Sequence, residues 1–401
     1  MSNPLIGVLY HWLGGLASAS FYIPYRGVKR WSWETYWLVG GVFSWIIAPL
    51  LLASLLVPEL WSLIASAPRD KMLLTYFFGV LWGVGGLTFG LTMRYLGIAL
   101  GMAVALGLCA AFGTLVPPIV KGEFVGLLGS SSGQLVLLGV AICLAGIAIS
   151  GMAGMSKEKE LSPEQKAASV KEFNFGKGML VAVFSGVMSS CFAYGLAAGE
   201  PLALLAKDAL ARHGGSDLWQ NLPVLIIVLW GGFTTNFIWC VMLNIKNRSS
   251  HQYLNLRPSA VAEVSAAEGV MLSAAAQEEV VQDSAAASHG APAGGSAVYE
   301  GPAPLLRNYV FSAIAGVTWY LQFFFYSMGE TKMGDFKFSS WTLHMASIII
   351  FSTLWGIVLR EWKGTSPRTH RLIALGLFVL IGSTVIVGYG NYIGGNTGGG
   401  H

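Results

Sequence analysis

Ten apolar stretches, each about 20 residues long, limit what this sequence can fold into. A bilayer core about 30 Å thick is crossed by an α-helix of roughly 20 apolar residues. Only 11% of the residues are charged, whereas soluble domains carry about 25%. The stretches lie near residues 5–24, 36–57, 73–92, 98–120, 134–153, 177–198, 221–245, 306–328, 341–361 and 371–390. The sequence therefore predicts an all-α polytopic membrane protein with ten transmembrane helices.

Lysine and arginine are distributed unevenly among the loops. Loops that follow odd-numbered stretches contain Arg26, Lys29, Arg30, Arg94, Lys157, Lys159, Lys166, Lys171, Lys177, Lys246, Arg248, Arg257, Arg307, Arg360, Lys363, Arg368 and Arg371. Loops that follow even-numbered stretches contain Arg69, Lys71, Lys121, Lys207, Arg212, Lys332 and Lys337. Because the more basic loops of membrane proteins stay in the cytoplasm, we expect the first group to be cytoplasmic and both termini to lie outside it.

The two halves of the chain share short patterns of Gly, Ser, Thr, Leu and Phe in the same order. The matched segments are 15–21 with 186–192, 112–115 with 351–354, and 138–151 with 375–388. A repeat of five helices contains an odd number of crossings, so the second copy enters the membrane from the opposite side. The sequence therefore predicts two inverted five-helix repeats, an arrangement found in many secondary transporters.

This repeat gives a domain division. Residues 249 to 304 are small and polar, with too few apolar side chains for a core, and are expected to be a mostly disordered cytoplasmic insert with at most one short helix. The predicted division is 1–153 for the first repeat, 154–176 for a linker, 177–390 for the second repeat with the 249–304 insert, and 391–401 for a Gly-rich tail.

The stretch "WYLQFFFYSMG" places a glutamine among aromatic residues inside the eighth predicted span. Trp319, Gln322 and Tyr326 fall on one helical face. An indole, an amide and a phenol suit a sugar, which offers apolar C–H groups and a rim of hydroxyls. The alternative is that the aromatic residues belong to an interfacial belt and that Gln322 bonds a neighbouring helix. We expect a substrate site here.

Two histidines lie inside predicted spans. Trp341 and His344 are one turn apart in "SSWTLHMAS", and His11 lies in the first span. We expect Trp341 to stack on substrate or act as a gate. Histidine titrates near neutral pH, so His11 or His344 is a candidate for carrying a proton. Each is equally compatible with a hydrogen-bonded packing role.

Charged residues and thiols provide few other candidates. Glu34, at the start of the second span, is either a helix-start acid at the membrane interface or a coupling carboxylate or gate partner. Arg94, at the end of the third span, is expected to be a gate or a cytoplasmic anchor. The cysteines have no metal-ligand spacing, and we interpret them as packing residues: Cys109, Cys143, Cys191 and Cys240.

Several function classes lack their sequence signatures. There is no GxxxxGK[ST] motif for an ATPase and no HExxH motif for a metallohydrolase. No basic and aromatic stripe suggests nucleic-acid binding. A membrane enzyme acting on lipid-linked sugars would need paired carboxylates or a metal cluster at one membrane face, and the sequence offers neither. We therefore expect no enzymatic activity, no cofactor and no metal.

The stretches "HWLGGLASASFYIPYRGVKRWSWETYW", "FGLTMRYLG", "WYLQFFFYSMG", "SWTLHM" and "LREW" resemble the bacterial L-rhamnose–proton symporter family of the drug/metabolite transporter superfamily. The resemblance covers nearly all ten spans. It implies two inverted five-helix repeats, an inner-membrane location, and uptake of L-rhamnose, or of L-lyxose or L-mannose, with a proton. For an inner-membrane protein, the distribution of lysine and arginine then predicts that both termini are periplasmic. The 249–304 segment is longer than the loop that this resemblance implies. A metabolite or drug exporter of the same fold is the alternative.

Overall fold

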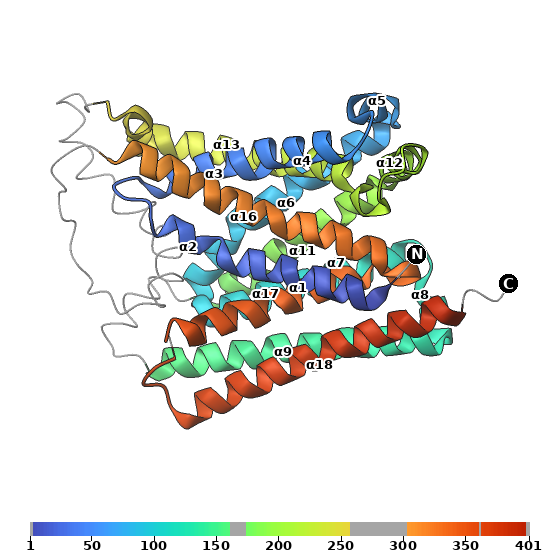
Figure 1. Cartoon of the computed structure of the whole chain (residues 1–401). Coiled ribbons are helices and arrows are strands. Elements are labelled where there is room, and N and C mark those ends of the chain that lie inside the picture. Colours follow the sequence, from blue (N-terminus) through green and yellow to red (C-terminus); the bar gives the residue numbers. More distant parts are fainter. Residues whose placement is uncertain (1–2, 161–173, 257–302, 361, 398–401) are drawn as a thin grey trace.

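The computed structural model describes residues 3–160, 174–256, 303–360 and 362–397, and every regular element among them is a helix (Figure 1). Short 3-10 or π-helical turns carry the label η. The elements are α1 (Pro4–Ser20), α2 (Tyr22–Tyr25), α3 (Trp33–Val42), η1 (Phe43–Ile47), α4 (Ala48–Leu56), α5 (Leu60–Ser66), α6 (Arg69–Leu96), α7 (Ile98–Val120), α8 (Phe124–Gly129), α9 (Ser131–Glu160), α11 (Phe175–Ala198), α12 (Glu200–Arg212), η2 (Asp217–Trp219), α13 (Leu222–Lys246), η3 (Ser249–Leu254), α16 (Leu305–Lys332), η4 (Gly334–Phe336), α17 (Ser339–Val358) and α18 (Pro367–Thr397). The predicted all-α class is confirmed.

Nine helices in the described part of the chain are long and apolar enough to cross a membrane. They match the second to the tenth predicted stretches, beginning with Trp33–Leu56 and ending with Pro367–Gly394. The first predicted stretch forms α1, which has 17 residues, followed by α2. α1 lies beside α16 and α17 within the same bundle (Figure 1).

Asparagine caps fix where two of the helices begin. The side chain of Asn3 accepts a hydrogen bond from the N–H of Ile6 at 3.3 Å, and Pro4 follows as the first helical residue. Asn174 accepts a hydrogen bond from the N–H of Lys177 at 3.0 Å at the start of α11. The caps satisfy N–H groups that have no partner inside the helix, and proline has no N–H to satisfy. Both α1 and α11 therefore start immediately after an asparagine.

The second predicted span is interrupted near its centre. α3 passes into the π-helical turn η1 before α4 continues. A π-turn widens the helix locally, and such turns occur frequently at functional sites. Ser44 and Trp45 lie in η1, and both are buried.

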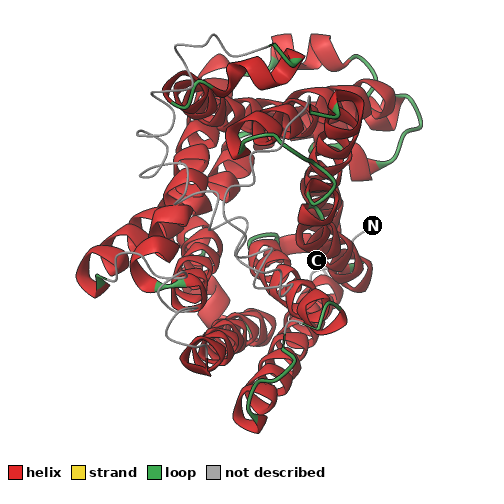
Figure 2. Ribbon diagram, turned by 90° about the vertical axis from the view of Figure 1, so that its left-hand side faces the viewer, coloured by secondary structure: helices red, strands yellow, loops and turns green. Residues whose placement is uncertain are grey.

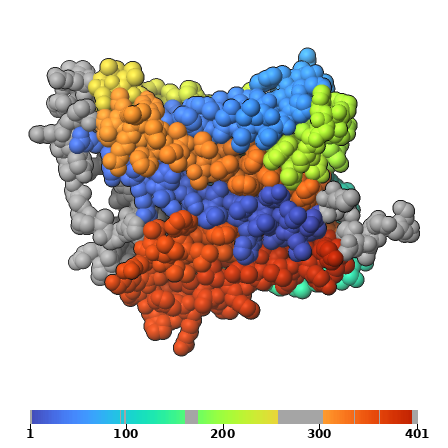
Figure 3. Space-filling model, viewed as in Figure 1, coloured from blue at the N-terminus to red at the C-terminus, as the bar shows by residue number. Residues whose placement is uncertain are grey.

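The helices pack in pairs that connect the two halves of the chain. α1 lies against α16 and α17, whereas α11 lies against α6 and α7. α9 packs against α18 at one edge of the bundle (Figure 1). Viewed from one end, the helices are seen nearly end-on and are joined by loops (Figure 2). The space-filling view shows α1 lying between α16 and the two C-terminal helices on one face (Figure 3).

Gly79 of α6 is pressed against the backbone of α13. A Cβ atom at this position would collide with the carbonyl oxygen of Val228 and would lie 3.1 Å from the Cα of Gly231. Gly79→Ala is therefore expected to lower stability by about 1–3 kcal/mol through overpacking. The measurement is the midpoint of thermal unfolding in detergent. Gly86→Ala is the control on the same helix, because no described atom of another helix lies within 4 Å of its Cβ position. Equal midpoints for the two variants would contradict this close packing.

The structure moves the start of the predicted insert at 249–304. Residues 249 to 254 form η3, and Tyr253 bonds the helices on either side of it in the chain, α13 and α16. Its hydroxyl accepts a hydrogen bond from Asn244 at 3.1 Å, and its carbonyl oxygen accepts one from the hydroxyl of Tyr309 at 3.0 Å. These polar residues pack against other helices, which composition alone does not reveal. Residues 257–302 of the predicted insert lie outside the described residues.

The predicted linker also begins too early. α9 continues to Glu160, whereas the prediction ends the first repeat at residue 153. The Glu160 carboxylate accepts hydrogen bonds from the N–H of Ser366 at 2.7 Å and from the hydroxyl of Thr369 at 2.7 Å. These contacts with the start of α18 stabilise the helix end. Residues 161–173 lie outside the described residues.

The predicted Gly-rich tail at 391–401 is helical over its first part. α18 continues to Thr397, although glycine disfavours helices. The side chain of Asn391 donates a hydrogen bond to the hydroxyl of Ser339 at 3.1 Å. Gly394 packs on the ring of Phe336. Contacts with the start of α17 therefore outweigh the weak helix propensity of this segment.

Candidate functional site

Trp319 lies midway along α16, in an aromatic cluster. Its ring stacks on that of Trp82 with the centroids 5.8 Å apart. It meets Trp45 edge-on at 5.1 Å and Phe21 at 6.2 Å. These partners come from α6, η1 and the end of α1, so Trp319 joins several helices. It therefore lies among the rings of other helices.

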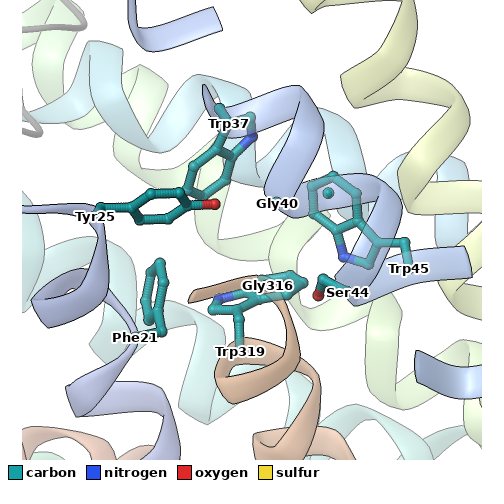
Figure 4. Close-up of a pocket in the computed structure, with 9 residues that line it drawn as sticks. Phe21, Tyr25, Trp37, Gly40, Ser44, Trp45, Gly316 and Trp319 are labelled. Carbon is teal, nitrogen blue, oxygen red and sulfur yellow. The ribbon is translucent and has the colours of Figure 1, made fainter. Parts of the chain in front are cut away.

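The same residue forms one wall of a pocket (Figure 4). Aromatic rings line most of this space, and three glycines bring the helix backbones close to it. The lining residues are Phe21, Tyr25, Trp37, Gly40, Gly41, Ser44, Trp45, Gly316 and Trp319. The pocket thus lies between the first helices of the chain and α16.

Two polar groups in the wall of this pocket have no hydrogen-bond partner among the described residues. The hydroxyl oxygen of Ser44 and the indole nitrogen of Trp45 are buried, and neither makes a hydrogen bond with a residue that the structure describes. A buried polar group without a partner is costly unless water or a ligand binds it. The π-helical turn η1 therefore supplies a donor and a hydroxyl to a space that is otherwise aromatic.

Gln322 lies between Trp319 and Tyr326 on α16. Its side chain is 4% exposed, and its amide makes no hydrogen bond with the described residues. The backbone carbonyl oxygen of Gln322 faces α1, where a Cβ atom on Gly14 would lie 2.9 Å from it. A bond from the amide to a neighbouring helix, the alternative interpretation, is not found among these residues. The amide is available to a ligand.

His11, Tyr326 and His344 form a compact group of buried rings. The Tyr326 ring centroid lies 5.3 Å from that of His11 and 5.2 Å from that of His344. The three residues come from α1, α16 and α17, respectively. The fold therefore brings together three of the residues that the sequence singled out.

The nitrogens of both imidazole rings are buried without a hydrogen-bond partner among the described residues. The hydroxyl of Ser347 lies 2.8 Å from the backbone carbonyl oxygen of His11 and 2.8 Å from that of His344. Ser347 thus ties the two backbones together while the rings remain unbonded. In the described part of the chain, each ring therefore has two nitrogens without a hydrogen-bond partner.

Trp341 lies beside this group. Its ring centroid is 5.7 Å from Tyr326 and 6.1 Å from His344. It stacks on Phe192 at 5.6 Å, and its indole N–H donates a hydrogen bond to the carbonyl oxygen of Cys109 at 3.1 Å. The polar atom of Trp341 is therefore already bound to protein in this conformation.

Glu34 is held by a different set of residues. It lies in the first turn of α3 and is 1% exposed. Its carboxylate accepts hydrogen bonds from the hydroxyl of Ser249 at 2.6 Å and from the amide of Asn247 at 3.2 Å. The structure thus places Glu34 at a contact between the first half of the chain and the segment after α13. The helix-start role and the gate or coupling role of Glu34 both stay predictions.

Arg94 lies near the end of α6, which finishes at Leu96. Its side chain lies outside the described residues. The gate or anchor role of Arg94 stays a prediction.

Two aromatic residues of the core were not singled out from the sequence. Trp82 stacks on Trp319, and Phe323 meets Trp82 edge-on at 5.4 Å. The internal repeat contained a signal for Trp82. Its distance in sequence from Trp319 equals the distance between the matched segments 138–151 and 375–388. The repeat could therefore have identified Trp82 as the counterpart of a predicted site residue.

A carboxylate on α16 was also missed. Glu330 lies one turn beyond Tyr326 and accepts a hydrogen bond from the amide of Asn221 at 2.8 Å. The predicted span ended at residue 328, whereas the helix continues to Lys332. An extension of the apolar stretch by one turn would have included this acid.

A family model described as L-rhamnose-proton symport protein matches residues 1–275 and 298–392. The chain belongs to this family. The resemblance inferred from the quoted motifs is thereby confirmed. Residues 276–297 are not matched by the family model. This unmatched segment is shorter than the insert predicted at 249–304.

Curated relatives of the family align with nearly the whole chain. The L-rhamnose-proton symporter of Yersinia pestis (strain Pestoides F) is 33% identical over 394 residues, which cover 97% of this chain and 99% of the relative. The L-rhamnose-proton symporter of Cronobacter sakazakii (strain ATCC BAA-894) has the same identity and coverage. With its membrane-spanning helices, the chain is a multi-pass membrane protein of a transporter family.

Proposed function

We propose that this protein takes up L-rhamnose together with a proton across the bacterial inner membrane. The match to the symporter family over nearly the whole chain carries the proposal. The relatives from Yersinia pestis and Cronobacter sakazakii are both named as L-rhamnose-proton symporters. Nothing in these matches favours a metabolite or drug exporter.

The aromatic pocket is the proposed sugar site. L-rhamnose is a 6-deoxy sugar, so it presents a methyl group and C–H groups beside its hydroxyls. Aromatic walls suit the apolar parts, and the unpaired groups of Ser44 and Trp45 suit the hydroxyls. Gln322 follows on α16 and can both donate and accept. Trp319 would contact the ring of the sugar.

The histidine group is the proposed proton site. His11 or His344 would bind the proton, because their ring nitrogens are unbonded within the described structure and a neutral imidazole has one nitrogen that can accept a proton. Tyr326 contacts both rings, and Trp341 lies beside them. Helix α16 carries Tyr326 as well as Trp319. A shift of α16 is therefore a physical route by which proton binding and sugar binding influence one another.

Two inverted five-helix repeats are the proposed architecture. α1, the first helix of the first repeat, packs on α16 and α17 of the second repeat. α11, the first helix of the second repeat, packs on α6 and α7 of the first repeat. Two equivalent repeats require each such contact to have a counterpart with the repeats exchanged. α1 and α11 run in opposite directions in Figure 1, as do α6 and α16. In this architecture α1 also crosses the membrane, which adds one crossing to the nine helices described above and gives ten. α1 starts and α18 ends at the same end of the bundle (Figure 1).

Close backbone contacts support the same exchange. Gly79 of α6 meets Gly231 of α13, and a Cβ atom on Gly316 of α16 would collide with the carbonyl oxygen of Gly40 of α3. α6 is the third span and α16 is the eighth. α3 is the first part of the second span, and α13 forms the seventh. Each contact therefore turns into the other when the repeats are exchanged.

Hydrogen bonds join the two repeats at the end that carries the α2–α3 loop. The backbone N–H of Lys29 donates to Asn308 at 2.9 Å, and the amide of Asn308 donates to the Lys29 carbonyl oxygen at 2.7 Å. The side chain of Gln252 accepts a hydrogen bond from the backbone N–H of Ser32 at 2.7 Å. Ser32 is close to Glu34 in sequence. We infer that these contacts close the cytoplasmic side and separate when sugar is released. The distribution of lysine and arginine supports this orientation, with both termini periplasmic.

Competition for uptake tests the substrate assignment. Excess unlabelled L-rhamnose is expected to block uptake of labelled L-rhamnose by the purified protein in proteoliposomes. L-Mannose replaces the methyl group by a hydroxymethyl group and L-lyxose lacks this carbon, so both are expected to compete more weakly. Equal competition by an unrelated sugar such as D-glucose would contradict a site shaped for L-rhamnose.

A further inference from the structure

Helix α16 carries a carboxylate that the proposed transport site does not use. Glu330 lies within the membrane-spanning segment Leu305–Lys332 and is partly exposed. It follows Tyr326 by four residues, so the two side chains occupy the same helical face one turn apart. Ionisable groups inside membrane helices are rare and usually functional.

The hydrogen-bond partner of Glu330 is neutral. The amide of Asn221, the residue before α13, donates to a Glu330 carboxylate oxygen at 2.8 Å. An asparagine amide has N–H donors and a carbonyl acceptor. It can therefore donate to a carboxylate and, after rotation, accept from a carboxylic acid. Asn221 is a suitable partner for both protonation states.

Nearby cations are engaged with other acids. The Nζ atom of Lys332 lies 2.9 Å from a carboxylate oxygen of Asp217. Charged groups that act on Glu330 from neighbouring elements are Lys337, Glu200 and Lys121. Among these, Glu200 lies between the two lysines, 3.9 Å from Lys121 and 4.0 Å from Lys337. Within the described structure Glu330 forms no ion pair, so it can gain a proton without breaking one.

The residue before Glu330 contacts the histidine group. A Cβ atom on Gly329 would lie 2.7 Å from Cε1 and 2.8 Å from Nε2 of the His11 ring. The carboxylate-bearing turn of α16 is thus adjacent to one proposed proton carrier. It also lies toward the end of the bundle where α1 starts and α18 ends (Figure 1).

We propose that Glu330 is the first acceptor of the transported proton on the side where both termini lie. The proposal rests on the proposed function as a proton symporter. A hydronium ion loses a proton to a Glu330 oxygen, which forms an O–H bond and leaves water. When the His11 imidazole accepts the proton, that O–H bond breaks and an N–H bond forms. The carboxylate then returns to its hydrogen bond with Asn221.

Glu330→Gln tests this role because glutamine keeps a hydrogen-bonding group of the same shape and cannot titrate. In proteoliposomes, accumulation of labelled L-rhamnose driven by a pH gradient is expected to fall at least tenfold. Exchange of labelled for unlabelled sugar without a gradient is expected to stay within about twofold of wild type. The pH profile of exchange is expected to lose one titration step. Glu330→Asp, which can still titrate, should retain part of the accumulation.

Asp208→Asn is the matched control, because Asp208 is an exposed acid on α12 and is not among the charged groups that act on Glu330. It is expected to accumulate sugar as wild type does. Wild-type accumulation by Glu330→Gln would overturn the proposal. Loss of exchange together with accumulation would also overturn it, since Glu330 would then serve binding or folding. Failure of the wild-type protein to accumulate L-rhamnose would instead overturn the proposed function itself.

Discussion

Gln322→Ala is expected to raise the KM for L-rhamnose uptake by about tenfold or more, while the protein still inserts into the membrane. Removing one partner of a buried hydrogen bond costs about 1–3 kcal/mol, because the other polar group is left unpaired. A change of 1.4 kcal/mol in binding free energy corresponds to a tenfold change in affinity. The Gln322 amide has no partner among the described residues. Its loss therefore removes little from the folded protein and more from the complex with the sugar.

The initial rate of uptake as a function of sugar concentration measures this effect. Gln134→Ala is the control, because Gln134 is exposed on α9 and its amide donates to the carbonyl oxygen of Leu128 at 2.7 Å. Its KM is expected to be unchanged. An unchanged KM in Gln322→Ala would remove Gln322 from the sugar site, and the pocket around Trp319 would then have to bind sugar without it.

Replacement of a histidine in the buried group is expected to separate exchange from accumulation. In one of the two variants, His11→Ala or His344→Ala, accumulation driven by a pH gradient should be lost while sugar exchange remains. The physical reason is that a carrier without its protonatable group can still change conformation with sugar but cannot use the gradient. Accumulation ratios and exchange rates, measured on the same proteoliposomes, give the two quantities.

His370→Ala is the control for these variants, because His370 is exposed at the start of α18 and lies outside the ring group. It should accumulate sugar normally. Full accumulation in both His11→Ala and His344→Ala would contradict a proton role for either residue. Glu34 would then be the next candidate among the residues first singled out.

The positions of the membrane helices could be predicted because a bilayer imposes one length and one polarity on them. Their ends could not, because local contacts decide them. The asparagine at position 391 prolongs α18 through glycine-rich sequence by bonding Ser339. Ser249 begins η3 and binds Glu34, although composition indicates an insert from this point. Such contacts join residues that are far apart in sequence.

The candidate site shows the same division. Helical periodicity identified Trp319, Gln322 and Tyr326, because it depends only on spacing along one helix. Sequence also singled out His11 and His344, but only the fold shows that both rings contact Tyr326. It also shows that Glu34 is bound elsewhere.

The aromatic pocket itself was not predicted. It depends on the π-helical turn that carries Ser44 and Trp45, and on the close approach of Gly40 and Gly316. A π-turn has no pattern that distinguishes it from the surrounding apolar helix. Trp319 was the one predicted site residue in its wall.

Uptake of labelled L-rhamnose by the purified protein in proteoliposomes, with and without an imposed pH gradient, tests the central claim most directly. We expect saturable accumulation when the outside is acidic, and collapse of that accumulation when a protonophore is added. Exchange without a gradient should remain. An absence of uptake by folded protein, or accumulation that a protonophore leaves unchanged, would contradict proton-coupled transport of this sugar.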